Sequence, residues 1–194
     1  MNFLGHLYFS ENNLELMYAN LFGDNVKGRN LEHFPEIVQK GIKLHRSIDN
    51  YIDHHPKVLD LMHQLYPELP KVTGIAIDLF FDYLLATNWD NYHPKSYDRF
   101  LEEFYTYNPT HWDDYSFEFQ EFITKMRTFK WMNYYTKFEG LEKSCEGVSH
   151  RLSFPNELKN APIIYLKHEK IITNCFKEYM IEACTFFKKK ESNI

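Results

Sequence analysis

The pattern of apolar residues predicts a chain of helices. Along most of the sequence, apolar side chains recur at intervals of three and four residues, which is the spacing of one helix face. Proline, glycine and short polar clusters separate these segments and supply helix starts and stops. We expect helices over residues 14–26, 36–54, 57–66, 73–89, 97–107, 115–131, 132–138, 141–152 and 163–189. Residues 2–9 are apolar except for His6, and so short a run fits a strand or a buried helix.

This series, without a convincing strand pattern, predicts an all-α fold. The length of 194 residues suits a single compact multi-helix domain spanning residues 1–194. Hydrophobic residues make up 44% of the chain and aromatic residues 18%, which is enough for a sizeable core. Only seven glycines and eight prolines are present, so a loop-rich β architecture is disfavoured.

The most apolar segment, residues 73–89, contains two aspartates four positions apart, Asp78 and Asp82. In a helix their carboxylates leave the same face, one turn apart. Burying an unpaired ion costs several kcal/mol, and repulsion between like charges raises one pKa. Such a pair therefore requires cations, hydrogen-bond donors or a metal ion opposite, and we interpret it as part of a divalent-metal site.

The segment at residues 36–54 carries His45, Asp49 and Asp53 at four-residue intervals beside its apolar stripe. An imidazole and a carboxylate at this spacing can share one metal ion, or the carboxylate can orient the imidazole. A single half-buried histidine is more often only hydrogen-bonded. The combination with Asp78 and Asp82 favours the metal interpretation.

Carboxylates with one or two imidazoles favour Mn²⁺, Mg²⁺ or Fe²⁺ over a thiolate zinc site. Nucleophile-elbow, P-loop and dinucleotide-binding motifs are absent from the sequence. Metal-assisted phosphoester hydrolysis is therefore the natural reaction class. The candidate residues are His6, Asp24, His45, Asp49, Asp53, Asp78 and Asp82.

Charge and composition narrow the partners. The net charge is −5, from 27 acidic and 22 basic residues, which argues against general nucleic-acid binding. Three cysteines without metal-type spacing fit a reducing compartment. We see no signal-peptide pattern and no run approaching the roughly 18 apolar residues of a membrane span. We therefore expect a cytoplasmic protein without a membrane partner, and the oligomeric state stays open.

Four motifs resemble those of a known family. They are MNFLGHLYFS, NLFGDNVKG, GIKLHRSIDNYIDHHP and IAIDLFFDYLLATNW. Together and in this order they resemble the acyl carrier protein phosphodiesterases, an unorthodox branch of the HD-type metal-dependent phosphohydrolases. After Trp89 the resemblance rests on helical character and on Arg151 following Ser149 and His150. The resemblance implies an HD-like helical domain.

The resemblance also implies an activity. It implies hydrolysis of the phosphodiester that joins 4′-phosphopantetheine to a serine of acyl carrier protein, with Mn²⁺ or Mg²⁺ as cofactor. One alternative is an HD-type phosphohydrolase acting on a nucleotide or another small phosphoester. Another is a non-catalytic helical module that binds a carrier protein.

The resemblance assigns roles to residues. The implied metal ligands are Asp24, His45, Asp78 and Asp82. His6 is then a proton donor to the serine oxygen, Asp49 orients a ligand, and Arg46 binds the phosphate. Because carrier proteins are acidic, we expect docking on positive side chains near the site. These are Lys27, Arg29, Lys40, Lys43 and Arg46.

One position departs from the family pattern. The family usually has a histidine after the second aspartate of the last motif, whereas this chain has Tyr83 after Asp82. If that histidine binds metal or donates a proton, its replacement weakens the activity.

Overall fold

The computed structural model describes residues 2–191, with side chains described for residues 2–188. Over this range the all-α prediction is confirmed, with nine α-helices, short 3₁₀ turns and no strand. The α-helices are α1 (Phe3–Tyr8), α2 (Leu14–Phe22), α3 (Glu36–Asp53), α4 (Pro56–Leu65), α5 (Thr73–Thr87), α6 (Tyr97–Thr106), α7 (Phe117–Phe129), α8 (Phe138–Arg151) and α9 (Ala161–Glu191). The relation to HD-type proteins stays a prediction.

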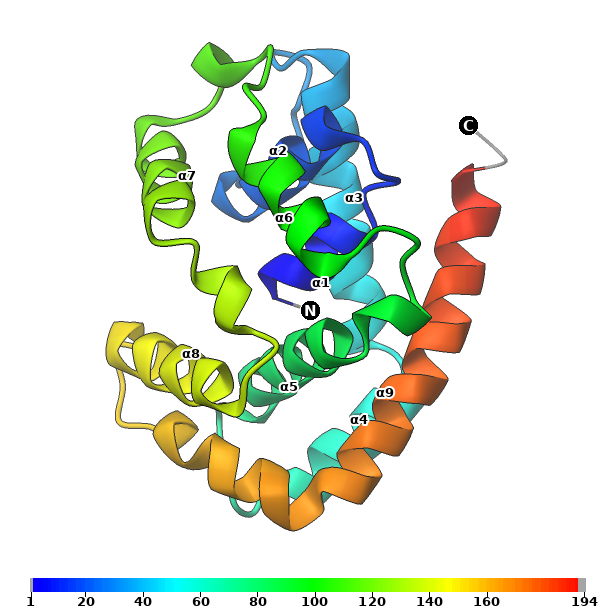
Figure 1. Ribbon diagram of the computed structural model, residues 1–194, viewed down its shortest axis with the longest axis vertical. Coiled ribbons are helices and arrows are strands. Elements are labelled where there is room, and N and C mark those ends of the chain that lie inside the picture. The colour runs from blue at the N-terminus through cyan, green and yellow to red at the C-terminus, as the bar shows by residue number, and fades with distance from the viewer. Residues whose placement is uncertain (1, 192–194) are drawn as a thin grey trace.

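The helices form two groups joined by α1 (Figure 1). In one group α2 packs against α3, with α6 and α7 beside them; in the other, α5 packs against α8 and α9. The short helix α1 packs against both α2 and α5. This position places His6, in the middle of α1, at the junction of the two groups.

A glycine sets the close packing of α2 on α3. A Cβ atom at Gly41 would lie 2.3 Å from Cβ of Ala19 and 2.5 Å from its backbone carbon. No side chain fits at such distances, so glycine at this point of α3 permits the contact. The turn after α2, Gly23–Asn25, is held against the same helix α3.

The structure corrects the predicted elements at two places. Residues 2–9, open between strand and helix, contain α1. The helix predicted at residues 132–138 is wrong: Trp131–Tyr134 is a 3₁₀ turn, and α8 begins at Phe138. Lys130, at φ 44°, ends α7 in the left-handed region and turns the chain away.

The longest helix, α9, is kinked at His168, where φ is −116°. It wraps the outer edge of the molecule, from the α8 end to the α3 side (Figure 1). Within the described residues, every helix is too short or too polar to cross a lipid bilayer.

Candidate active site

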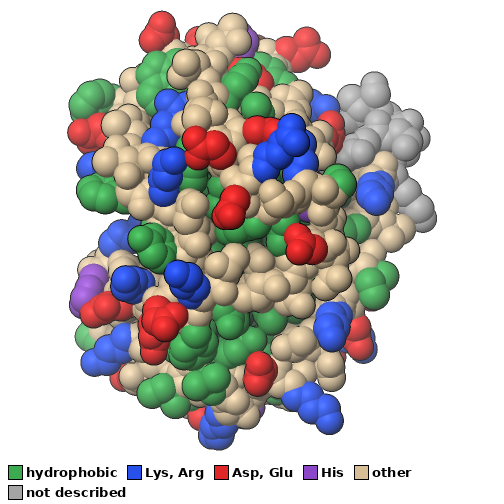
Figure 2. Space-filling model, in the orientation of Figure 1, with side chains coloured by type: hydrophobic (Ala, Val, Ile, Leu, Met, Phe, Trp, Pro, Cys, Tyr) green, Lys and Arg blue, Asp and Glu red, His purple; other side chains and the backbone are tan. Residues whose placement is uncertain are grey.

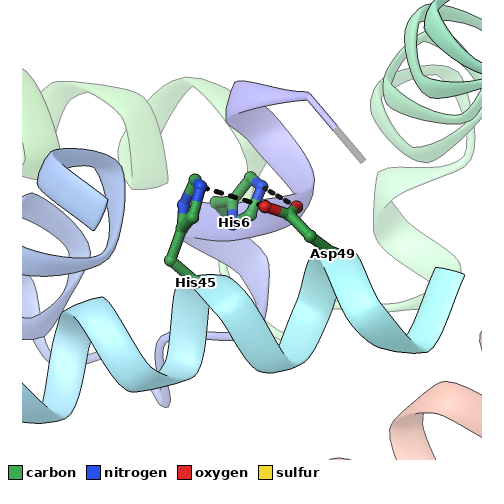
Figure 3. A group of neighbouring side chains, drawn as sticks. All are labelled: His6, His45 and Asp49. Carbon is green, nitrogen blue, oxygen red and sulfur yellow. Dashed lines mark ion pairs between the residues drawn. The ribbon is translucent and has the colours of Figure 1, made fainter. Parts of the chain in front are cut away.

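Three predicted site residues, His6, His45 and Asp49, form one compact cluster (Figure 3). Nε2 of His6 lies 3.2 Å from Oδ1 of Asp49, and Nε2 of His45 lies 3.1 Å from Oδ2. The two imidazoles stack with ring centroids 4.2 Å apart. Helix α3 supplies His45 and Asp49 one turn apart, and α1 supplies His6. Two imidazole nitrogens thus face one carboxylate.

The protonation of His6 is fixed by Asn20 of α2. The amide nitrogen of Asn20 donates to the carbonyl of His6 at 2.8 Å and to Oγ of Ser10 at 2.9 Å. The amide oxygen of Asn20 therefore faces Nδ1 of His6, at 3.0 Å, as an acceptor. Nδ1 must carry the proton, so Nε2 of the neutral ring presents a lone pair toward Asp49.

His45 is held by a close approach of the backbone. A Cβ atom at Gly23 would lie 2.4 Å from Cβ of His45 and 2.6 Å from its Cγ, so this position admits only glycine. Nδ1 of His45 is buried without a hydrogen-bond partner among the described residues. The ring of His45 stacks on His6, and its Nε2 pairs with the carboxylate of Asp49.

The pKa directions match this arrangement. Burial lowers the pKa of His6, so the ring is neutral at pH 7. Burial alone would raise the pKa of Asp49, but the two imidazoles paired with its carboxylate, His45 and His6, outweigh it and hold that pKa well below the usual range. A neutral imidazole beside a carboxylate is the protonation state that metal binding requires.

A cavity of about 440 Å³ surrounds the cluster, and further carboxylates line it. Asp24, Asp53 and Asp78 all line it, so these three predicted residues lie around His6 and Asp49. Burial raises the pKa of Asp53, and the negative charge of Asp78 raises it further. Four carboxylates around one cavity supply oxygen donors of the kind that could hold a divalent cation.

Asp82 has a different position and does not line this cavity. Its two carboxylate oxygens accept hydrogen bonds from the backbone N–H groups of Leu4, at 2.8 Å, and Gly5, at 3.0 Å. Burial raises the pKa of Asp82 to about 7, although these N–H groups act to lower it. Asp82 therefore anchors the first turn of the helix that carries His6, and the hydrogen-bond donors expected opposite this aspartate are backbone groups.

Two further predicted positions lie outside the cavity lining. Arg46, expected to bind phosphate, donates from Nη2 to the carbonyl of Val26 at 2.9 Å and so ties α3 to the loop after α2. Tyr83 packs edge-on against Phe138 and Tyr165. Tyr83 therefore belongs to the aromatic packing around α8 and α9, outside the lining of this cavity.

Arg151, at the end of α8, lines the cavity beside the cluster. Among residues 2–188 it takes part in no ion pair, and its side chain is exposed. One feature of the sequence pointed to Arg151, the resemblance of Ser149-His150-Arg151 to the family, but that resemblance implied no role for it. Asn20 gave no signal, because only the packing of α2 on α1 reveals its contact with His6.

The fold and the site together define an all-α protein with two imidazoles and several carboxylates around one candidate catalytic cavity. The chain belongs to the acyl carrier protein phosphodiesterase family, whose model matches residues 1–183. It is 35% identical over 107 residues to acyl carrier protein phosphodiesterases of Escherichia coli O9:H4 (strain HS) and E. coli strain SE11. This match covers 55% of the chain and 54% of each relative, so the chain spans about half the length of these curated relatives. No solved structure matches.

Proposed function

We propose that this protein is a metal-dependent phosphodiesterase that removes 4′-phosphopantetheine from holo-acyl carrier protein and releases apo-acyl carrier protein. The observation that carries the proposal is the cluster of His6, His45 and Asp49 inside an acidic cavity. Family membership supports the choice of phosphodiester and carrier protein.

The residues present fit a divalent cation. The lone pair of His6 Nε2 points at a carboxylate oxygen 3.2 Å away, and two facing acceptors repel each other unless a proton or a cation lies near both. His6, His45 and Asp49 would hold Mn²⁺ or Mg²⁺, with Asp24 and Asp78 as further oxygen donors in the lining. The bound ion would polarise the phosphoryl group and lower the pKa of water.

This assignment changes the roles expected for three residues. His6 becomes a ligand instead of a proton donor, because its Nδ1 proton is engaged by Asn20. Asp49 becomes a ligand in place of Asp82, whose oxygens bind the start of α1.

The proposed reaction is a hydrolysis. Water adds to phosphorus, the bond between phosphorus and the serine oxygen breaks, and that oxygen takes up a proton. The phosphate stays with pantetheine. Within this chain, Asn20 keeps Nε2 of His6 unprotonated, and Arg151, which lines the cavity, offers a positive charge to the phosphoryl oxygens.

The carrier protein would dock beside Asp24. Lys27 and Arg29 are exposed and follow Asp24 and Asn25, which form one wall of the cavity. An acidic partner placed there has its serine close to the cluster. Lys40 and Lys43 precede His45 in α3 and line a separate cavity. They would therefore contact only the periphery of a carrier protein docked beside Asp24.

One assay tests the proposal. Holo-acyl carrier protein is incubated with the protein and Mn²⁺, and the mass of the carrier protein is followed. We expect loss of the prosthetic group, and we expect His45→Gln to lower the rate by about 100-fold or more. His63→Gln, at an exposed position of α4, is the matched control and keeps the wild-type rate.

A folded wild-type sample that leaves the carrier-protein mass unchanged with every divalent ion rules out the proposed reaction. An aryl phosphodiester added to the assay separates the alternatives. An enzyme for small phosphoesters hydrolyses it without competition from the carrier protein. A non-catalytic binding module hydrolyses neither compound.

A further inference from the structure

A second cavity adjoins the one that holds the cluster. It has a volume of about 680 Å³ and lies between α7 and α8. The two cavities share four lining residues: Asn2, Phe3, Phe122 and Arg151. The surface is indented between these helices, where apolar and basic side chains gather (Figure 2). A ligand held at the cluster can therefore extend into this groove without crossing the protein.

Aromatic side chains form the walls of the α7–α8 groove. Phe129 is 67% exposed and Tyr134 is 49% exposed, although both are large and apolar. Trp131 adds a third ring between them in sequence. Large rings that stay this exposed at a concave surface are typical of a binding site.

One face of α8 forms the floor of the groove. Gly140, Lys143, Ser144, Gly147 and Arg151 all line it, and these positions share one face of the helix. The rise of an α-helix gives this face a length on the order of 16 Å. Arg151 lines both cavities, whereas the exposed rings of Phe129 and Tyr134 line the groove alone.

We propose that the α7–α8 groove binds the pantetheine arm of the substrate. This proposal rests on the proposed function. The arm is a narrow, uncharged chain with a dimethyl group and two amides, so it suits aromatic walls with a few polar groups such as Ser144. Arg151 at the junction binds the phosphoryl group, and the arm runs from there along α8. The groove therefore selects substrates by the group on the far side of the phosphate from the serine.

Gly147 offers a way to fill the groove without disturbing the fold. A Cβ atom at this position meets nothing within 4 Å, whereas one at Gly140 would lie 1.9 Å from the carbonyl oxygen of Tyr134. Leucine is also a better helix former than glycine. Gly147→Leu therefore adds a side chain to the groove while α8 stays intact. Glu146→Leu, at the neighbouring exposed position outside the lining, is the matched control.

The test compares the two variants in two measurements. The first is the ratio of kcat/KM for holo-acyl carrier protein to kcat/KM for bis(4-nitrophenyl) phosphate, a diester without the arm. We expect Gly147→Leu to lower this ratio by about tenfold or more, since excluding a few methylene-sized groups has effects of this size. We expect Glu146→Leu to keep the wild-type ratio. The melting temperature of each variant verifies that it is folded.

The second measurement is calorimetric titration with 4′-phosphopantetheine, which does not depend on turnover. We expect binding to weaken about tenfold in Gly147→Leu, in line with the first measurement, and to be unchanged in Glu146→Leu. Equal affinity of wild type and Gly147→Leu for this compound overturns the groove proposal. The proposal is also overturned if Gly147→Leu loses as much affinity for apo-acyl carrier protein, which lacks the arm, as it loses for 4′-phosphopantetheine. The groove would then contact the surface of the carrier protein.

The two proposals fail in different ways. If the wild-type protein leaves holo-acyl carrier protein intact, the proposed function fails, and the titration still tests the groove. If the wild-type protein releases the prosthetic group and Gly147→Leu does so with an unchanged ratio, only the groove proposal fails.

Discussion

At the scale of single residues, the site depends on one buried amide. Asn20 is fully buried and makes three hydrogen bonds: with the ring of His6, with the carbonyl of His6 and with Ser10. These bonds determine both the position and the tautomer of His6. A partner of this kind commonly fixes the ring of a metal-binding histidine.

Replacing Asn20 by leucine, which has a similar volume, removes this control. We expect Mn²⁺ affinity to fall about 10–100-fold, because the His6 ring loses its fixed tautomer. We also expect a loss of about 1–3 kcal/mol of unfolding free energy from the buried groups left without partners. Calorimetric Mn²⁺ titration and urea unfolding measure both effects. Asn50→Leu, exposed on α3, is the control, and equal Mn²⁺ affinity in both variants would contradict the role of Asn20.

The burial of Asp82 leads to a prediction about how the stability of the protein depends on pH. Its pKa rises to about 7 in the fold, whereas the unfolded chain has an ordinary aspartate near pH 4. Between these values the folded state holds a proton that the unfolded state has released, so this residue lowers stability as pH rises from about 4 to about 7. The full change is about 4 kcal/mol, from roughly three pKa units at about 1.4 kcal/mol each.

The difference in unfolding free energy between wild type and Asp82→Asn isolates this effect. We expect the wild type to lose stability relative to the variant across this pH range, because the amide of asparagine does not titrate. Urea unfolding at several pH values measures the difference. A difference that is constant with pH would show that the two backbone N–H groups keep Asp82 ionised despite its burial.

At the scale of elements, the periodic pattern predicted most helices well. The apolar stripe and the spacing of His45 and Asp49 are properties of α3 alone, so the sequence was sufficient to pair these side chains. The weaker predictions concern short segments. Residues 2–9 had too few turns for a period, and the segment before α8 is broken by the left-handed Lys130.

The contact of α2 with α3 yields a paired prediction on two glycines. At Gly41 an added methyl group meets Ala19 at 2.3 Å, so Gly41→Ala must separate the helices; we expect a loss of about 1–3 kcal/mol. At Gly147 the same substitution meets open space, and we expect a gain of up to about 1 kcal/mol from helix propensity. Chemical unfolding of both variants measures the two changes in unfolding free energy, which should have opposite signs. Stabilisation by Gly41→Ala would contradict the close packing.

At the scale of the whole molecule, the site arises from packing that a linear pattern does not encode. Asp78 and Asp82 lie four residues apart and looked equivalent in sequence. The position of α1 separates their roles: Asp78 lines the cavity, whereas Asp82 binds the start of α1. The position of His6 beside Asp49 likewise depends on the packing of α1 against α2 and α5. The sequence therefore identified several residues that line the cavity, but it also placed Asp82 there, whose carboxylate the fold uses to hold α1.

The last prediction concerns stability with and without metal. The cluster draws residues from α1 and α3, so an ion bound there links two helices that are far less constrained in the unfolded chain. We expect Mn²⁺ at about 100 times its dissociation constant to add about 2.7 kcal/mol of stability, and EDTA to remove this gain. Thermal unfolding with and without Mn²⁺ measures the shift. Asp49→Asn should abolish the shift, whereas Asp60→Asn, exposed on α4, should keep it.

The stabilisation by Mn²⁺ should also depend on pH. Burial lowers the pKa of His6 below 6.5, so protons compete with the ion for this ring only in acid below that pH, and the stabilisation by Mn²⁺ declines there. An equal Mn²⁺ shift in wild type and Asp49→Asn would mean that the ion binds elsewhere, and the cluster would then have to be explained by the His–Asp hydrogen bonds alone.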